Sequence, residues 1–145
     1  MKKNIILLIF LPIFSLSQIQ EQTKNYISVG LFDHKTGFSA IGYTRSVLQN
    51  TNNEFFVGFG SMIALNTFVI GYKKYLLRSF VDGYSVVSMQ KIYGMAGNPN
   101  ATFLSLGFET RIWKILFINI GINVTNLLED ADLLTFPSLS INIRY

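Results

Sequence analysis

The feature that most constrains this chain is an alternation of apolar and polar residues with a period of two, which runs from about residue 26 to the last residue. The final segment, residues 138–145, has the sequence SLSINIRY, so its apolar residues fall at odd positions and its polar residues at even positions. Residues 115–125 repeat the pattern over a greater length. Successive side chains of a β-strand point to opposite faces of a sheet, and this period therefore predicts an all-β protein.

Turn-forming residues divide the alternating region into eight segments. Clusters of Gly, Asn, Asp and Pro favour turns, and they occur at residues 33–37, 49–54, 66–67 and 97–100. We expect strands at about 26–33, 37–48, 55–64, 67–77, 82–94, 102–112, 115–125 and 136–145. The fifth segment is irregular because Ser88 and Gln90 share a parity with Tyr84 and Val86. A β-bulge near Val86 and Val87 would restore the alternation.

The composition of the polar parity indicates which face points inward. It is rich in Gly, Ser and Asn, and only 14% of the chain is charged, against about a quarter in soluble domains. Small residues suit the interior of an eight-stranded barrel, which side chains fill. The apolar parity then faces lipid, where unpaired backbone groups force a spanning sheet to close on itself. We expect the following glycines to face inward: Gly30, Gly42, Gly58, Gly60, Gly71, Gly107 and Gly121.

The first seventeen residues have the composition of a secretory signal peptide. Lys2 and Lys3 precede the apolar run IILLIFLPIFSL at residues 5–16, which is too short for a spanning helix of about 20 residues. Ser15 and Ser17 are small residues spaced as at a cleavage site. We expect a signal peptide at 1–17 and one barrel domain at 18–145; the alternative is an anchoring helix that is never cut.

By this pattern, residues 25–145 resemble the small eight-stranded outer-membrane barrels of the OmpA and OmpX type. The most specific part of the resemblance is the last strand, which ends in an aromatic residue. Its alternating residues look like the segment that the family's barrel-assembly machinery recognises: Leu139, Ile141, Ile143 and Tyr145. The resemblance implies a closed, antiparallel, up-and-down transmembrane barrel in a bacterial outer membrane, with both termini in the periplasm. It also implies outer loops centred on 33–37, 65–67, 95–101 and 125–135.

Four charged residues share the inward parity, namely Lys73, Glu109, Arg111 and Arg144. An isolated ion inside a narrow barrel is costly to desolvate, so charges there need partners. We therefore predict a lumenal ion-pair network that joins Glu109 to one or more of the three cations. Such a network either holds the barrel shut or lines a narrow polar pore.

Other candidate sites are weaker. Glu129, Asp130 and Asp132 offer oxygen ligands for calcium but lack the spacing and glycine of a dedicated calcium loop, so a solvated loop is the simpler interpretation. The only histidine, His34, follows Asp33, and together with Ser61 it suggests a lipid-active enzyme at the outer rim. The chain has no Cys and no Lys/Arg run, and we expect no cofactor, no metal and no nucleic acid.

The leading functional hypothesis is therefore a non-catalytic, integral outer-membrane barrel of structural or surface-interaction type. Its partners are the lipid of the outer membrane, the assembly machinery during insertion, and an extracellular partner that the sequence does not identify. The alternatives are a lipid-active enzyme, a narrow pore, and a soluble exported barrel of lipocalin character. The last alternative requires the apolar face to turn inward.

Overall fold

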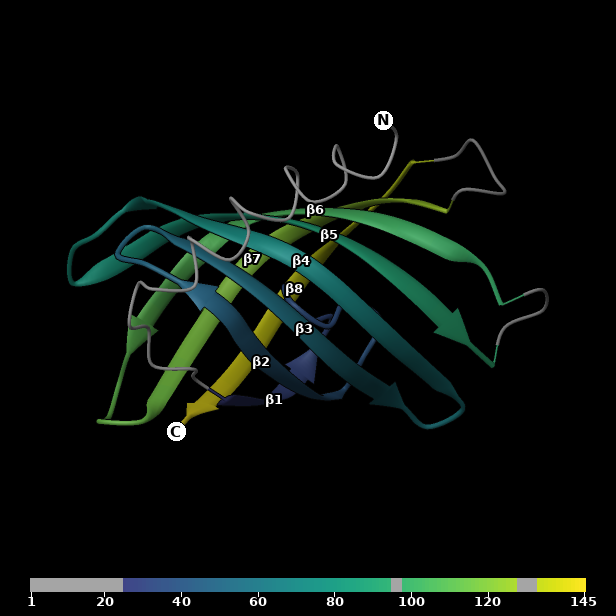
Figure 1. Cartoon of the computed structure of the whole chain (residues 1–145), viewed down its shortest axis with the longest axis horizontal. Coiled ribbons are helices and arrows are strands. Elements are labelled where there is room, and N and C mark those ends of the chain that lie inside the picture. The colour runs from purple at the N-terminus through teal and green to yellow at the C-terminus, as the bar shows by residue number, and fades with distance from the viewer. Residues whose placement is uncertain (1–24, 95–97, 128–132) are drawn as a thin grey trace, which may run out of the picture.

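A computed structural model describes residues 25–94, 98–127 and 133–145, and within them the chain forms one closed antiparallel barrel (Figure 1). The eight strands are β1 (Asn25–Leu31), β2 (Ile41–Gln49), β3 (Asn53–Met62), β4 (Leu65–Leu77), β5 (Val81–Tyr93), β6 (Asn100–Arg111), β7 (Leu116–Leu127) and β8 (Leu133–Arg144). The expected all-β class and the expected eight-stranded closure are confirmed. The predicted signal peptide at 1–17 lies outside the described residues. No helix among those residues has the length and hydropathy to cross a membrane.

Each strand pairs with the next along the chain, and β1 closes the ring by pairing with β8, where Val29 lies opposite Ile141. Short connections at residues 50–52, 78–80 and 112–115 lie at one end of the barrel with the C-terminus, which we call the turn end. The connections after β1 and β3 begin at the opposite end, the loop end, where β5 and β7 also end (Figure 1). Because every strand has two neighbours, the sheet has no free edge.

The two faces of the wall differ in polarity as the alternation predicts. In β8, Leu139 and Ile141 are exposed on the outer face, whereas Ser140 and Asn142 are buried in the lumen. The other strands follow the same rule, and polar and charged residues outnumber apolar ones among the buried side chains described. A soluble domain has the opposite arrangement. The predicted inward glycines fall on the lumenal parity of their strands.

One pair of glycines is required because neighbouring atoms leave no room for a Cβ. Gly107 on β6 lies opposite Gly121 on β7, and a Cβ on Gly107 would lie 2.5 Å from the carbonyl oxygen of Ile120 and 2.7 Å from the hydroxyl of Tyr84. The Tyr84 ring therefore occupies lumenal space that a side chain at Gly107 would need.

Three strand expectations were wrong. β5 pairs without a register shift from Tyr84 to Tyr93, so the bulge expected near Val86 and Val87 is absent, and Val86 is simply a buried lumenal residue. The irregularities lie instead at Ser46/Leu48 in β2 and Tyr75/Leu77 in β4. Residues 66–67 belong to β4, and the turn lies at 63–64. β2 begins at Ile41 rather than residue 37, because the preceding segment enters the lumen.

Candidate functional site

The connection between β1 and β2, residues 32–40, enters the barrel, and we call it the lumenal loop. Asp33, His34, Lys35 and Thr36 are at most 2% exposed. The prediction of an outer loop centred on 33–37 was therefore wrong. The loop turns back at two residues with left-handed backbone conformation, Phe32 (φ 53°) and Gly37 (φ 61°). Glycine adopts this conformation without strain.

Asp33 holds the lumenal loop in its folded form. Its Oδ2 accepts hydrogen bonds from the backbone N–H of Lys35 (3.1 Å), the backbone N–H of Thr36 (3.2 Å) and the Thr36 hydroxyl (3.2 Å). Its Oδ1 accepts one from the Ser140 hydroxyl of β8 (2.6 Å), which ties the loop to the wall. A single carboxylate thus pairs four donors. Each of them would cost about 1–3 kcal/mol if it were buried without a hydrogen-bond partner.

Lys35 crosses the lumen to Glu54 on β3. Its Nζ lies 2.5 Å from Oε1 of Glu54, which also accepts a hydrogen bond from the Ser46 hydroxyl. The same ammonium lies 3.6 Å from the centre of the Tyr26 ring, on the face that attracts cations. Both charges of this pair are fully buried, so each depends on the other to offset the cost of leaving water.

A second network joins β4, β6 and β8. Lys73 Nζ of β4 lies 2.8 Å from Glu109 Oε2 of β6, and Arg144 of β8 forms an ion pair with the same carboxylate. Lys73 Nζ also lies 3.2 Å from His34 Nε2. An ammonium can only donate, so Nε2 accepts and the imidazole carries its proton on Nδ1, 3.2 Å from Asp33 Oδ1. The lumenal loop and the wall thus form one connected polar structure.

The structure brings together three of the four predicted network residues. Glu109, Lys73 and Arg144 are in contact, whereas Arg111 is exposed at the end of β6 and forms no ion pair with a described residue. The Lys35–Glu54 pair was not predicted from the sequence. Glu54 shares the inward parity of Phe56, and this parity could have predicted that Glu54 points into the lumen. Nothing in the sequence indicated that Lys35 enters the lumen.

Aromatic side chains close the loop end of the lumen. The Phe32 and Phe136 ring centres are 4.6 Å apart, and Phe38 of the lumenal loop packs on Phe136 and Phe103 with ring-centre distances of 5.2 Å. Ile92 and Ala101 are buried in the same cluster. The lumen therefore holds an aromatic layer at its loop end, and the buried charged residues of the lumenal loop and the wall lie beyond it.

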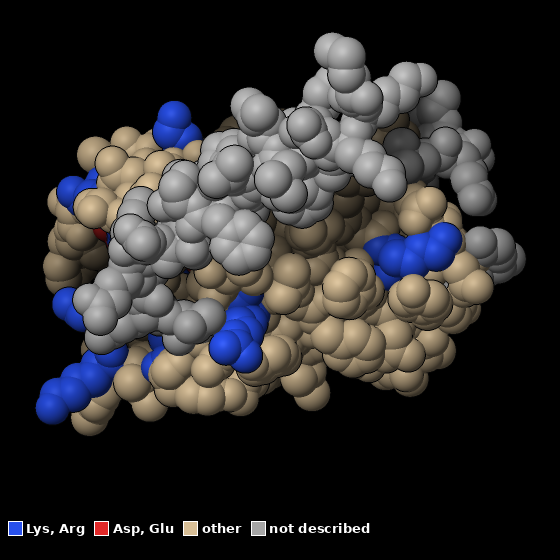
Figure 2. Space-filling view, in the orientation of Figure 1, with Lys and Arg blue, Asp and Glu red and all other residues tan. Residues whose placement is uncertain are grey.

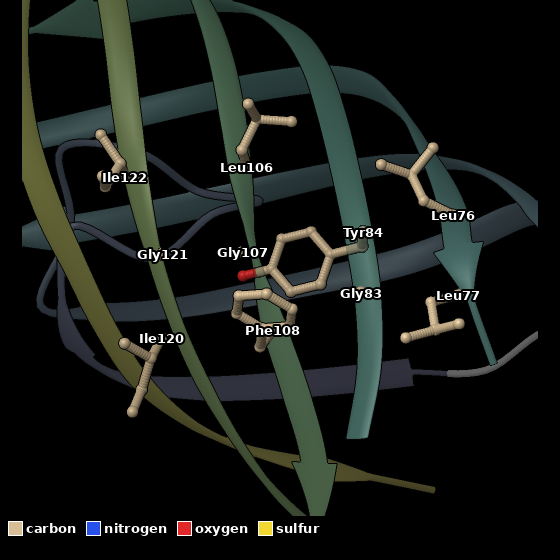
Figure 3. A pocket seen from close by; sticks show the side chains of 10 residues that line it. All are labelled: Leu76, Leu77, Gly83, Tyr84, Leu106, Gly107, Phe108, Ile120, Gly121 and Ile122. Carbon is tan, nitrogen blue, oxygen red and sulfur yellow. The ribbon is translucent and has the colours of Figure 1, made fainter. Parts of the chain in front are cut away.

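The outer wall carries an apolar hollow of about 570 Å³ across β4 to β7 (Figure 3). Its floor contains Gly83, Gly107 and Gly121, and Figure 3 shows the side chains of Leu106 and Phe108 beside them. The lining is almost wholly apolar. The hollow offers no set of polar groups for chemistry and belongs to the outward apolar face.

The remaining candidates are not assembled into a site. His34 is buried in the lumen, whereas Ser61 pairs with Ile41 on the outer parity of the wall, so the two lie on opposite sides of the sheet. The acidic residues Glu129, Asp130 and Asp132 lie outside the described residues, within which there is no group of three His, Cys, Asp or Glu able to hold a metal. The proposed assembly residues point outward from the last strand and the C-terminus: Leu139, Ile141, Ile143 and Tyr145.

No protein-family model, curated protein or solved structure matches the chain.

Proposed function

We propose that the protein is an integral β-barrel of a bacterial outer membrane, non-catalytic, and of structural or surface-interaction type. One observation carries the proposal: the wall is apolar outside and polar inside. Ile122 and Leu106, in the middle of β7 and β6, are 56% and 53% exposed, whereas Asn123 and Ser105 beside them are buried. In water this outer face would be a large apolar patch of the kind that soluble monomers avoid.

The barrel has the two properties that a sheet needs to span a bilayer, namely sufficient strand length and a closed hydrogen-bond network. Strands of 9–11 residues, tilted by about 45°, cross a bilayer, and most strands here are at least that long, for example β2 with 9 residues and β6 with 12. Ring closure leaves no free edge, and an unpaired backbone group in hydrocarbon costs several kcal/mol. The signal peptide proposed at 1–17 and the outward residues of β8 fit export and assembly by the same route.

The filled lumen favours a structural barrel over a pore. The lumenal loop and the buried Lys35–Glu54 and Lys73–Glu109 pairs occupy the path along the barrel axis. The lipocalin alternative needs an apolar interior for its ligand, whereas the described interior is mainly polar. A surface role would fall to the loop end, which the resemblance to outer-membrane barrels places outside the cell.

Cell fractionation combined with gel electrophoresis tests the proposal. We expect the protein in the outer-membrane fraction, resistant to extraction with urea or carbonate, and migrating at different positions before and after boiling. Removal of residues 2–17 is expected to abolish export. Recovery of unboiled, folded protein from detergent-free aqueous extracts would refute the membrane location and favour a soluble barrel.

A further inference from the structure

A cavity of about 420 Å³ opens into the barrel at the turn end, and we call it the vestibule. Its lining comes from the ends of four strands and one turn, and the residues that matter below are Arg78, Asp82, Glu109, Arg111, Phe117 and Arg144. The vestibule ends at the Lys73–Glu109 pair, beyond which lies the lumenal loop. It is therefore a blind recess rather than a passage.

The acceptors in the vestibule are already used. Both oxygens of Asp82 accept hydrogen bonds, from Arg78 Nη1 (3.1 Å) and from the backbone N–H of Ser79 (3.2 Å). Glu109 Oε2 accepts from Lys73, and Oε1 accepts from the Tyr75 hydroxyl (3.3 Å). Each oxygen of the two carboxylates thus already accepts from the protein's own donors.

Donors, by contrast, are left over. Arg111 has no hydrogen bond or ion pair to the described part of the chain. Arg144 is held by Glu109 and by the Phe117 ring, 3.7 Å from its guanidinium carbon, yet its buried Nε has no hydrogen-bond partner among the described residues. A buried N–H without a partner destabilises the fold. The missing component is therefore an acceptor.

The net charge of the vestibule also favours an anionic ligand. The vestibule lining contains three guanidinium groups, of Arg78, Arg111 and Arg144, against two carboxylates, and Lys73 at its floor adds a further cation. Figure 2 shows several basic side chains toward the left of the molecule, which is the turn end in Figure 1, with a small acidic patch among them. An anion entering this recess meets a net positive wall, which attracts it.

We propose that the vestibule binds a phosphate group. Arginine donors are planar forks that match phosphate oxygens, and the two with donors left over, Arg111 of β6 and Arg144 of β8, approach from separate strands. Arg78 of the β4–β5 turn already donates to Thr51 and Asp82 and contributes positive charge. A tetrahedral oxyanion offers acceptors in several directions, whereas a carboxylate offers one edge. The phosphate comes either from free phosphate in solution or from a lipid headgroup at the membrane surface.

Isothermal titration calorimetry on the full mature barrel distinguishes the two sources. One arm adds inorganic phosphate to protein in non-ionic detergent. The other adds mixed micelles containing phosphatidic acid to protein in phosphate-free buffer, with micelles of the same detergent without phospholipid as the blank. Saturable binding in the first arm identifies free phosphate as a ligand, and saturable binding in the second arm alone identifies the headgroup. Saturable binding in neither arm would overturn the proposal.

Matched variants locate the site. We expect Arg111→Gln to weaken binding at least tenfold and Arg111→Lys to retain part of it. Lys114→Gln removes a cation from the neighbouring turn that does not line the vestibule, and its affinity is expected to equal that of the parent protein. Equal losses in Arg111→Gln and Lys114→Gln would show attraction to the general charge of the turn end and would contradict a vestibule site. Altered migration of the boiled and unboiled forms identifies any variant that fails to fold.

Discussion

Lys73 and Glu109 face each other inside the barrel from β4 and β6, with Nζ 2.8 Å from Oε2, and neither side chain is more than 1% exposed. Glu109 is also the partner of Arg144. One carboxylate therefore compensates two cations that the barrel holds away from bulk water. The free-energy cost of losing this carboxylate should exceed that of losing any surface charge.

Glu109→Gln is therefore expected to destabilise the barrel strongly. The substitution keeps the shape but leaves Lys73 and Arg144 as buried cations without a counter-charge, which costs about 3–5 kcal/mol. Urea titration in detergent, read as the fraction of folded band on an unheated gel, measures the change. The double variant Lys73→Met/Glu109→Gln is expected to recover part of the loss, because one uncompensated cation is gone. A change in Glu109→Gln below about 0.5 kcal/mol, as at ordinary surface sites, would contradict the network's role.

Two neighbouring glycines provide a test of the tight wall. A Cβ at Gly107 would lie 2.5 Å from a backbone oxygen, whereas a Cβ at Gly83 meets nothing closer than Leu77 Cβ at 3.4 Å. Gly107→Ala is expected to cost about 1–3 kcal/mol by overpacking, and Gly83→Ala to be nearly neutral. Paired urea titrations compare the two variants. Equal stability of Gly107→Ala and Gly83→Ala would show that the wall is less tightly packed than the structure implies.

The lumenal loop should block ion flow. We expect the parent protein to give no steady conductance in planar bilayers, because residues 32–40 and the two ion-pair networks occupy the lumen. The double variant Asp33→Ala/Lys35→Ala removes the carboxylate that organises the loop and the ammonium that anchors it to Glu54. That variant is expected to show frequent current steps. Stable ohmic steps from the parent protein would instead support a pore.

The alternation of residue types was sufficient to predict the barrel and its polarity. The inward parity of Glu109 and Lys73 follows from a period of two, because each strand has only two faces. The strand number follows from the turn-forming clusters, and the closed up-and-down order was implied by the resemblance to outer-membrane barrels. The path of the lumenal loop could not be predicted in this way. Asp33 and Lys35 are turn-type and charged residues that commonly lie in solvent, and their burial depends on Ser140 and Glu54, which are distant in sequence. Local patterns carry no information on such long-range partners.

Charge placed on the outer face should destabilise the barrel according to depth. Ile122 lies in the middle of β7 and points outward, whereas Val47 points outward near the turn end of β2. If the face contacts lipid, Ile122→Arg costs about 2–4 kcal/mol and Val47→Arg about 0–1 kcal/mol. Urea titrations of barrels refolded into phospholipid vesicles measure both values. Equal costs, or a stabilising Ile122→Arg, would indicate that the face meets water.

Site-directed spin labelling tests the orientation of the wall most directly, since the chain contains no cysteine and each variant carries a single label. Labels at Leu106→Cys and Ile122→Cys report on the outer face, and a label at Lys114→Cys in the β6–β7 turn serves as the aqueous reference. In vesicles, we predict that the first two labels collide with oxygen dissolved in lipid and are shielded from a water-soluble nickel complex, with the reverse at position 114. Collision of the nickel complex with the labels at 106 and 122, at the frequency seen at 114, would contradict the membrane barrel.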